Sequence, residues 1–268
     1  MANTIRIGLF GAAGRMGRIL ARMVLEDARL ELAAAIEGPS SPHLGQDIGT
    51  LAGLAPAHRP IRTDADALDV LIDFSTASAL DSSLGIAQAC GAALIIGTTG
   101  HSPEQLERVH EAAAQRAVLK SANMSIGVNV LARVVADVAR ILGPEFDCEI
   151  AEAHHRYKLD APSGTALFLL DGVLNATERT RAEHVIYGRE GHQPRRPGEI
   201  AVHTVRLGGV VGEHEVRFGS MGETLTLGHT ALSREVFAAG ALRAAAWIHG
   251  KPPGLYGMSD VLFGPSQG

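Results

Sequence analysis

The residues with the clearest capacity for chemistry lie in one segment, 152–166, whose sequence is EAHHRYKLDAPSGTA. It contains two adjacent histidines, His154 and His155, followed by Lys158. Histidine gives or takes a proton near neutral pH, and lysine adds a positive charge. In an extended segment the two histidines point to opposite sides, so one would act as the acid while the other orients substrate or packs. The pattern predicts proton transfer to an anionic substrate.

The end of this segment is a predicted helix start that offers a place for an anion. The first backbone N–H groups of a helix have no partner within it, and Ser163 and Thr165 add two hydroxyls beside Gly164. A substrate carboxylate is the anion that we expect there. The alternative is a surface loop with an ordinary helix cap. The cluster as a whole, next to a cofactor-type fold, favours the catalytic interpretation.

A glycine-rich turn between a predicted strand, 4–10, and a predicted helix, 15–26, indicates a dinucleotide site. Glycines let the backbone turn tightly and approach a pyrophosphate at the helix N-terminus. The spacing is GxxGxxG rather than GxGxxG, and a purely structural turn is the alternative. Glu37 strengthens the cofactor interpretation, because it lies 20 positions after Gly17 and can accept hydrogen bonds from ribose hydroxyls. The turn consists of Gly11, Ala12, Ala13, Gly14, Arg15, Met16 and Gly17.

The residues around Glu37 predict which nicotinamide cofactor is preferred. Gly38, Pro39 and Ser40 follow it, so no arginine stands beside the carboxylate to neutralise a 2′-phosphate. A lone carboxylate repels that phosphate, and we therefore expect a preference for NADH. Arg15 leaves room for NADPH as a second cofactor.

Two further turns follow predicted strands of the same region. Strand carboxyl ends of an open α/β sheet face the cofactor crevice, so hydroxyls and amides at these positions are candidates for holding the nicotinamide side. The alternative is an ordinary strand-ending turn for the first and a hinge between domains for the second. The candidate residues are Gly97, Thr98 and Thr99 in the first turn, and Ser121, Ala122, Asn123 and Met124 in the second.

Length and composition limit the class of protein. The chain has 268 residues, a length that predicts about two domains. Its net charge is −5, whereas nucleic-acid-binding proteins are usually basic. No apolar stretch is long enough to span a membrane, and the start of the chain has no signal-peptide pattern, so we expect a cytoplasmic protein. Aromatic residues make up only 4%, which favours a small polar substrate. Cys90 and Cys148 form neither a redox pair nor a disulfide framework.

Apolar, β-branched runs alternate with amphipathic stretches through the first half of the chain. This order is typical of βαβ units, and it predicts an α/β domain with a Rossmann-like parallel sheet. Ser102, Pro103 and Gln105 form a capping-box pattern that starts a helix reaching about Arg116. The predicted strands are 4–10, 30–37, 69–75, 92–99 and 117–123, and the predicted helices are 15–26, 76–90, 102–116 and 128–142.

The second half predicts an α+β domain with an open mixed sheet. A strand over 148–155 and a helix over 163–177 precede successive strands within 200–232, where apolar alternation indicates one buried face and a second face open to solvent or a partner. The arginine-rich stretch 178–199 is predicted to be a long exposed loop. A helix over 233–249 is followed by a Pro-Pro-Gly turn and a tail.

Several of these motifs together resemble the 4-hydroxy-tetrahydrodipicolinate reductase family of the diaminopimelate route to lysine. The resemblance covers nearly the whole chain, and its most specific part is the string over 152–166. It implies an enzyme that transfers a nicotinamide hydride to a cyclic, unsaturated imine dicarboxylate, giving tetrahydrodipicolinate. The matching motifs are GAAGRMG, IDFST, GTTG, SANMSIGVNV, EAHHRYKLDAPSGTA and VGEHEV.

The resemblance also implies roles for individual residues. His154 corresponds to the proton donor and acceptor, Lys158 to a second proton donor and His155 to a substrate contact. Gly164 and Thr165, with Ser163 adjoining, correspond to the pair that holds a substrate carboxylate. The dinucleotide contacts correspond to Gly11–Met16, Glu37, Gly97–Thr99 and Ser121–Met124.

At the level of domains, the resemblance implies a homotetramer assembled through the second sheet. It also implies a first domain completed by the C-terminal helix, so the expected domains are 1–125 with 234–268, and 126–233. Gly38 stands where relatives that use NADPH often carry arginine, which puts dual cofactor use in doubt, and Met124 replaces a frequent phenylalanine, which puts rigid nicotinamide positioning in doubt. His101 also departs from the common family residue, an aromatic.

The competing hypotheses are another two-domain nicotinamide dehydrogenase and a dinucleotide sensor without turnover. A semialdehyde enzyme would need a nucleophilic cysteine, for which Cys148 is poorly placed. Glu213, His214 and Glu215 lack a second ligand cluster, so they are interpreted as structural and no metal site is predicted.

Overall fold

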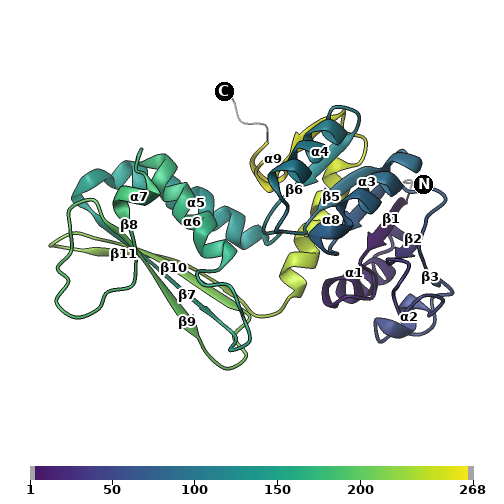
Figure 1. Ribbon diagram of the computed structural model, residues 1–268, viewed down its shortest axis with the longest axis horizontal. Coiled ribbons are helices and arrows are strands. Elements are labelled where there is room, and N and C mark those ends of the chain that lie inside the picture. Colours follow the sequence, from purple (N-terminus) through teal and green to yellow (C-terminus); the bar gives the residue numbers. More distant parts are fainter. Residues whose placement is uncertain (1–3, 265–268) are drawn as a thin grey trace. The chain divides into compact units, whose positions relative to one another are not determined.

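The computed structural model describes residues 4–264, which divide into two compact units (Figure 1). Unit 1 contains residues up to 126 together with those from 234 onward, and unit 2 contains residues 127–233. Within the described part of the chain, no helix has the length and apolar character needed to cross a membrane.

Unit 1 is built on a seven-stranded sheet in which every neighbouring pair is parallel. The strand order is β12-β6-β5-β4-β1-β2-β3, so β1 lies inside the sheet and its carboxyl end faces the glycine-rich turn. The predicted parallel sheet is confirmed. Its strands are β1 (Ile5–Phe10), β2 (Leu30–Ile36), β3 (Ile61–Arg62), β4 (Val70–Asp73), β5 (Ala93–Ile96), β6 (Ala117–Lys120) and β12 (Gly254–Tyr256).

Helices cover both faces of this sheet, which explains why its strands are nearly continuous apolar runs. One core joins Ile7 and Leu9 to the helices α1 (Arg15–Glu26), α8 (Glu235–Ile248) and α9 (Met258–Phe263). The other joins Leu71 and Leu94 to α3 (Leu80–Ala89) and α4 (Pro103–Ala113). The short elements α2 (Ile48–Leu51) and η1 (Ala77–Ala79) complete the unit.

The start of α4 confirms the predicted capping box. The Ser102 hydroxyl accepts a hydrogen bond from the Gln105 backbone at 3.3 Å, and the Gln105 side chain accepts one from the Ser102 backbone at 2.9 Å. These two bonds satisfy backbone donors that the helix leaves without partners.

The chain end differs from the sequence prediction of a turn and a tail. Gly254–Tyr256 forms β12, which pairs with Ala117–Leu119 of β6 and becomes the outer strand of the sheet. The short β3 was also missed. Three or fewer residues carry too little periodicity to mark a strand, and their pairing depends on chain segments far away in sequence.

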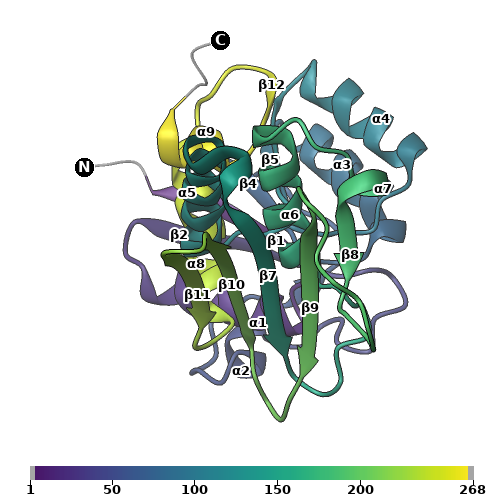
Figure 2. The same cartoon turned by 90° about the vertical axis from the view of Figure 1, so that its left-hand side faces the viewer.

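Unit 2 has a five-stranded mixed sheet, as predicted, in the order β11-β10-β7-β9-β8. β10 is antiparallel to β7 and β11, whereas β9 is parallel to β7 and β8. Helices α5 (Ile126–Leu142) and α6 (Gly164–Ala176) pack on one face, and no helix of the described unit covers the other (Figure 2). The strands are β7 (Asp147–His154), β8 (Val185–Tyr187), β9 (Ile200–Arg206), β10 (Gly212–Gly219) and β11 (Thr224–Ala231), and η2 covers Gly143–Glu145.

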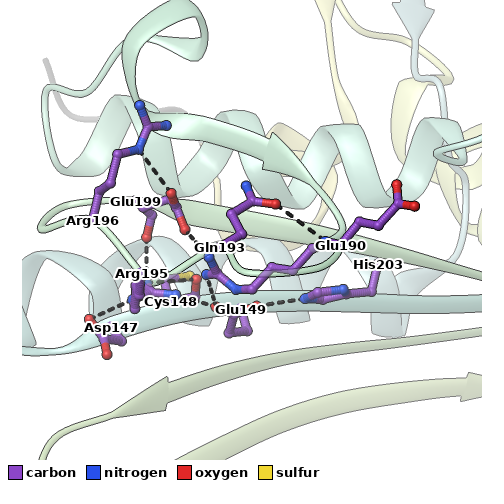
Figure 3. Close-up of polar contacts among 10 residues, drawn as sticks. Asp147, Cys148, Glu149, Glu190, Gln193, Arg195, Arg196, Glu199 and His203 are labelled. Carbon is purple, nitrogen blue, oxygen red and sulfur yellow. Dashed lines mark hydrogen bonds and ion pairs between the residues drawn. The ribbon is translucent and has the colours of Figure 1, made fainter.

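The prediction of a long exposed loop over 178–199 is right only in part: 188–199 is a loop and most of it is exposed, whereas 181–187 forms a helix and a strand. The segment contains α7 (Arg181–His184) and β8. Arg181, Arg189, Arg195 and Arg196 form ion pairs, and Figure 3 shows those of Arg195 and Arg196. Arg195 pairs with Asp147 at 2.7 Å and Arg196 with Glu199 at 3.1 Å. The acidic partners of Arg195 come from the start of β7, so the sequence around the arginines does not reveal them. We call Arg189, Arg195, Arg196, Glu149 and Glu199 the arginine cluster.

Candidate functional site

The glycine-rich turn 11–14 between β1 and α1 leads directly into the exposed N-terminus of α1, and we call this turn with the first turn of α1 the cradle. Gly11 has a φ of +81°, and a Cβ there would lie 2.9 Å from the Phe74 carbonyl oxygen. A Cβ on Gly17 would lie 2.2 Å from the Gly11 carbonyl oxygen. Among the described residues, no side chain caps the first turn of α1, because its cap is Gly14. Its backbone N–H groups can therefore bind a phosphate, as the glycine spacing predicts. Ala12 and Ala13 are buried, whereas Arg15 is exposed.

Glu37 lies at the end of β2 against this turn. Its Oε1 accepts a hydrogen bond from the Ala13 backbone N–H at 2.7 Å. The carboxylate is therefore fixed beside the cradle, where a ribose would be bound. Sequence reasoning missed Arg62, which is adjacent to Ile36 in the register of β2 and β3. The Arg62 guanidinium is paired with Asp64 and Asp66, each at 3.1 Å.

The two remaining turns of the cofactor prediction follow β5 and β6 at the same edge of the sheet. Gly97, Thr98 and Thr99 line a pocket of about 370 Å³ together with residues 74–77. The Thr98 hydroxyl donates to buried Asp73 at 3.1 Å, which holds this turn against the end of β4. In the second turn the Ser121 hydroxyl donates to the Asn123 carbonyl at 2.8 Å, Met124 is buried and Ala122 is exposed.

Unit 1 therefore fits a dinucleotide. A Cβ at Gly11 would strike the Phe74 carbonyl oxygen, one at Gly17 the Gly11 carbonyl oxygen and one at Gly97 the Phe74 ring, so these tight turns require glycine. The fit to a dinucleotide rests on the backbone N–H groups at the start of α1, which no side chain of the described residues caps. The turns after β1, β5 and β6 lie at the carboxyl edge of the parallel sheet, together with Glu37 at the end of β2.

His154 is the last residue of β7 in unit 2 and is buried. Its Nδ1 contacts a carboxylate oxygen of Glu152, two residues earlier on the same strand face. Glu152 also accepts from the Ser163 backbone N–H at 3.1 Å and from Arg206 Nη1 at 3.1 and 3.2 Å. A buried carboxylate thus joins the predicted proton donor to the predicted anion site.

A second buried histidine, His214, lies beside His154. Their ring centroids are 5.0 Å apart in an edge-to-face arrangement. His214 Nε2 is 3.2 Å from the Ser163 hydroxyl. Burial, with a smaller contribution from nearby His154, lowers the pKa of His214 to about 4, so His214 is neutral at neutral pH. Burial also lowers the pKa of His154, although Glu152 opposes that effect.

Lys158 and His155 occupy the loop that follows β7. Lys158 Nζ is 2.8 Å from Asp160 Oδ1, and its side chain is mostly covered. Burial raises the pKa of Asp160, but hydrogen bonds from Lys158 and from backbone N–H groups, including that of Gly164, outweigh this effect and lower it. Asp160 thus contacts both the ammonium and the N-terminus of α6. The His155 ring is half-buried, 6.5 Å from the ring of Tyr157.

The start of α6 has the geometry that the sequence predicts. Ser163 is the N-cap, and its hydroxyl accepts from the Ala166 backbone N–H at 3.1 Å. Gly164 is exposed and Thr165 half-buried. The structure therefore brings together Ser163, Glu152 and His154, with Lys158 linked to the same helix start through Asp160.

Three functional candidates escaped sequence reasoning: Glu152, Arg206 and His214. The interpretation of His214 as structural stays a prediction, and the structure adds that the register pairs it with Glu152 and places it against His154 and Ser163. Strand alternation was a usable signal, since it separates His214 from Glu213 and Glu215. The pairing of β7 with β10, however, is not visible in a single sequence.

The ligand atoms of Glu152, His154 and His214 lie within 4.8 Å of one another, a spacing that a metal ion could use. The Glu152 oxygens already accept from Arg206 and from the Ser163 N–H. A guanidinium on the same carboxylate opposes a metal cation. These contacts favour a hydrogen-bonded network, and the absence of a metal stays a prediction.

These two groups of residues, on this fold, define the class of two-unit α/β oxidoreductases that use a nicotinamide dinucleotide. Residues 5–124 match the family model "Dihydrodipicolinate reductase, N-terminus", and residues 127–262 match "Dihydrodipicolinate reductase, C-terminus". The chain belongs to the dihydrodipicolinate reductase family.

Similar proteins agree with this assignment. A 4-hydroxy-tetrahydrodipicolinate reductase from Halorhodospira halophila is 44% identical, over 97% of this chain and 99% of that protein. One from Rubrobacter xylanophilus is 46% identical, over 96% and 98%. A dipicolinate-bound dihydrodipicolinate reductase from Paenisporosarcina sp. TG-14 has the same fold, with a TM-score of 0.75 at 24% identity over 97% of this chain and all of that one.

Proposed function

We propose that the protein reduces 4-hydroxy-tetrahydrodipicolinate, by way of dihydrodipicolinate, to tetrahydrodipicolinate in the diaminopimelate pathway of lysine biosynthesis. The observation that carries the proposal is the network of His154, Glu152 and Ser163. It links a buried proton donor to a helix start suited to a carboxylate. A bound NADH supplies the hydride.

The residues of unit 2 have complementary roles in this reaction. Protonated His154 donates a proton to the substrate, and the Lys158 ammonium stabilises the negative charge that develops as hydride arrives and acts as a second proton donor. Gly164 and Thr165, with Ser163 adjoining, hold one substrate carboxylate at the N-terminus of α6. His155 contacts the substrate.

The cofactor is held by unit 1 through Gly11–Met16, Glu37, Gly97–Thr99 and Ser121–Met124. We infer that NADH is preferred over NADPH, because Glu37 is fixed beside the cradle and Arg62 is already paired with two aspartates. A comparison of kcat/KM for the two cofactors tests this, and a tenfold or greater preference for NADPH, about 1.4 kcal/mol, contradicts it.

Substitution of the two catalytic residues tests the reaction assignment. His154→Ala and Lys158→Ala are each expected to lower kcat by about 100-fold or more, the usual contribution of a general acid. The measurement is NADH oxidation with freshly generated dihydrodipicolinate. Wild-type turnover in both variants contradicts the catalytic roles of His154 and Lys158. Binding of NADH without any turnover by the wild-type protein supports a dinucleotide sensor instead.

We also propose that the protein is a cytoplasmic homotetramer assembled through the uncovered face of the unit 2 sheet. Val205 is 46% exposed on that face, in register with Ala153. Small residues, including Ala151 and Gly228, leave a hollow of about 310 Å³ there. Light scattering should give four times the 28.1 kDa chain mass, and Val205→Arg should lower it. Ile141→Arg, on an exposed α5 position, should not.

A further inference from the structure

Glu152 is the most completely buried carboxylate of unit 2, with a side chain that is 0% exposed. Burying a carboxylate is costly unless charges and hydrogen-bond donors compensate for the lost water. Glu152 has three such donors: Arg206, the Ser163 backbone N–H and His154 Nδ1. Well-packed apolar side chains often replace buried ion pairs without loss of stability, so the fold by itself does not require a carboxylate here.

The charge state of Glu152 decides which nitrogen of His154 carries a proton. Burial raises the pKa of Glu152, but the hydrogen bonds from His154 and Ser163 and the Arg206 guanidinium outweigh burial and lower it. An ionised carboxylate only accepts hydrogen bonds. His154 Nδ1 must therefore be the donor, which leaves Nε2 as the nitrogen that gains or loses a proton.

We propose that Glu152 is a positioning residue: its anchored carboxylate fixes the tautomer and orientation of His154, so that Nε2 delivers the proton to the substrate. This inference rests on the proposed role of His154 and deepens it. The proton leaves Nε2, the ring becomes neutral with Nδ1 still bound to Glu152, and solvent restores the proton after turnover.

The surroundings of the His154 ring agree with an acting Nε2. A Cβ built on Gly212 would lie 3.1 Å from Nε2, so the glycine keeps that side of the ring from being crowded. Glu152 also connects the ring to the rest of the site, because the Ser163 N–H begins α6 and Arg206 donates a further hydrogen bond to the Asp160 carbonyl. The carboxylate therefore couples the proton donor to the helix start that is proposed to hold the substrate.

The first test observes the His154 tautomer directly in the full-length protein. In ¹⁵N-labelled wild-type protein, long-range ¹⁵N–¹H correlation spectra should show a protonated Nδ1 and a titrating Nε2 for His154. In Glu152→Gln, which keeps the shape but loses the charge, both tautomers should be populated. A wild-type spectrum with an unprotonated Nδ1 overturns the proposal, and this measurement does not require any variant to fold.

The second test is kinetic. Glu152→Gln should lower kcat at least about 10-fold, as expected when a catalytic histidine loses its orienting carboxylate, while KM changes by less than about threefold. The carboxylate favours the imidazolium, so its removal should move the loss of activity on raising pH to a lower pH. A structural role alone would lower the melting temperature without moving the pH profile.

Glu149→Gln is the matched control. Glu149 lies on the same strand and also contacts arginine and a histidine, His203, but it has no contact with His154. It should leave kcat and the pH profile unchanged. If Glu152→Gln behaves like this control while His154→Ala is inactive, the positioning role fails and the proposed function stands. If His154→Ala is fully active, the proposed function itself fails.

Discussion

Ser163 shows how much one residue does in this site. Its hydroxyl accepts from Ala166 N–H and lies 3.2 Å from His214 Nε2, while its own N–H donates to Glu152. The side chain thus begins α6 and holds a neutral buried histidine, and the backbone helps to anchor the carboxylate next to His154. Replacing Ser163 by alanine removes the two hydroxyl contacts but keeps the backbone hydrogen bond to Glu152, so it separates the role of the side chain from that of the backbone.

Ser163→Ala should destabilise the protein by about 1–2 kcal/mol, because the helix loses its cap and His214 loses a partner. The free energy of unfolding in urea measures this. Ser102→Ala is the matched control, since it removes a cap of α4 that touches no buried histidine, and it should cost about 1 kcal/mol. Equal losses for the two variants would mean that the His214 contact adds nothing.

The pKa of His214 makes a second prediction at the residue scale. It is about 4 in the folded protein and 6.5 ordinarily, so below pH 6.5 the unfolded chain binds a proton that the folded protein does not. The free energy of unfolding should therefore fall as pH drops from 6.5 to about 4. Above pH 6.5 His214 should make no contribution to the pH dependence.

His214→Asn should reduce this dependence of stability on pH, measured by urea unfolding at several pH values in that window. His192→Asn is the control, because His192 is exposed. An unchanged slope in His214→Asn would contradict the buried, neutral state of His214.

At the scale of elements, the arginine cluster fastens the segment before β9 to the start of β7. Glu199 is 2% exposed and pairs with Arg189 and Arg196. Burial raises the pKa of Glu199, but the two arginines outweigh it and lower it. The carboxylate therefore contributes stability above its ordinary pKa, and this contribution is lost as pH falls through the lower folded value.

Glu199→Gln should destabilise the protein by about 1–3 kcal/mol at neutral pH, since it leaves arginine donors without their charged partner. The difference from wild type should shrink in acid, where wild-type Glu199 is protonated too. Thermal unfolding measures both. Asp137→Asn, which breaks two exposed ion pairs within α5, with Arg133 and Arg140, should change stability less. A loss that is independent of pH would contradict the ion-pair explanation.

The same elements show what the sequence could predict. Strand runs in unit 1, the Ser102 capping box and the Ser163 helix start are local patterns, and each was found where it was expected. The contacts of Glu149 in the arginine cluster, the pairing of β12 and the contacts of His214 depend on partners 40 or more positions away, such as Glu149 for Arg189. Such pairings are set by the register between strands, which cannot be predicted from a short stretch of a single sequence.

At the scale of the whole molecule, the two ends of the chain jointly make unit 1. Helix α8 supplies Ala238, Ala241, Ala244, Ala245 and Ile248 to the core that contains β1 and α1. The helix also lies directly on the turn after β6. A Cβ built on Gly240 would be 1.7 Å from the Met124 carbonyl oxygen, a distance that no packing adjustment of side chains relieves.

Gly240→Ala should therefore displace α8 or the Met124 turn, destabilise the protein by about 2–4 kcal/mol and weaken NADH binding. Replacing a glycine by alanine at an open helix position should instead increase stability. Gly85→Ala in α3, where no described atom outside the backbone of its own helix and its chain neighbours lies within 4 Å of the added Cβ, should stabilise the protein by about 0.5–1 kcal/mol and leave NADH binding unchanged. Urea unfolding and NADH fluorescence titration measure the two effects. Because both glycines are helical and belong to unit 1, a similar response in the two variants would show that α8 does not support the turn that is proposed to bind the cofactor.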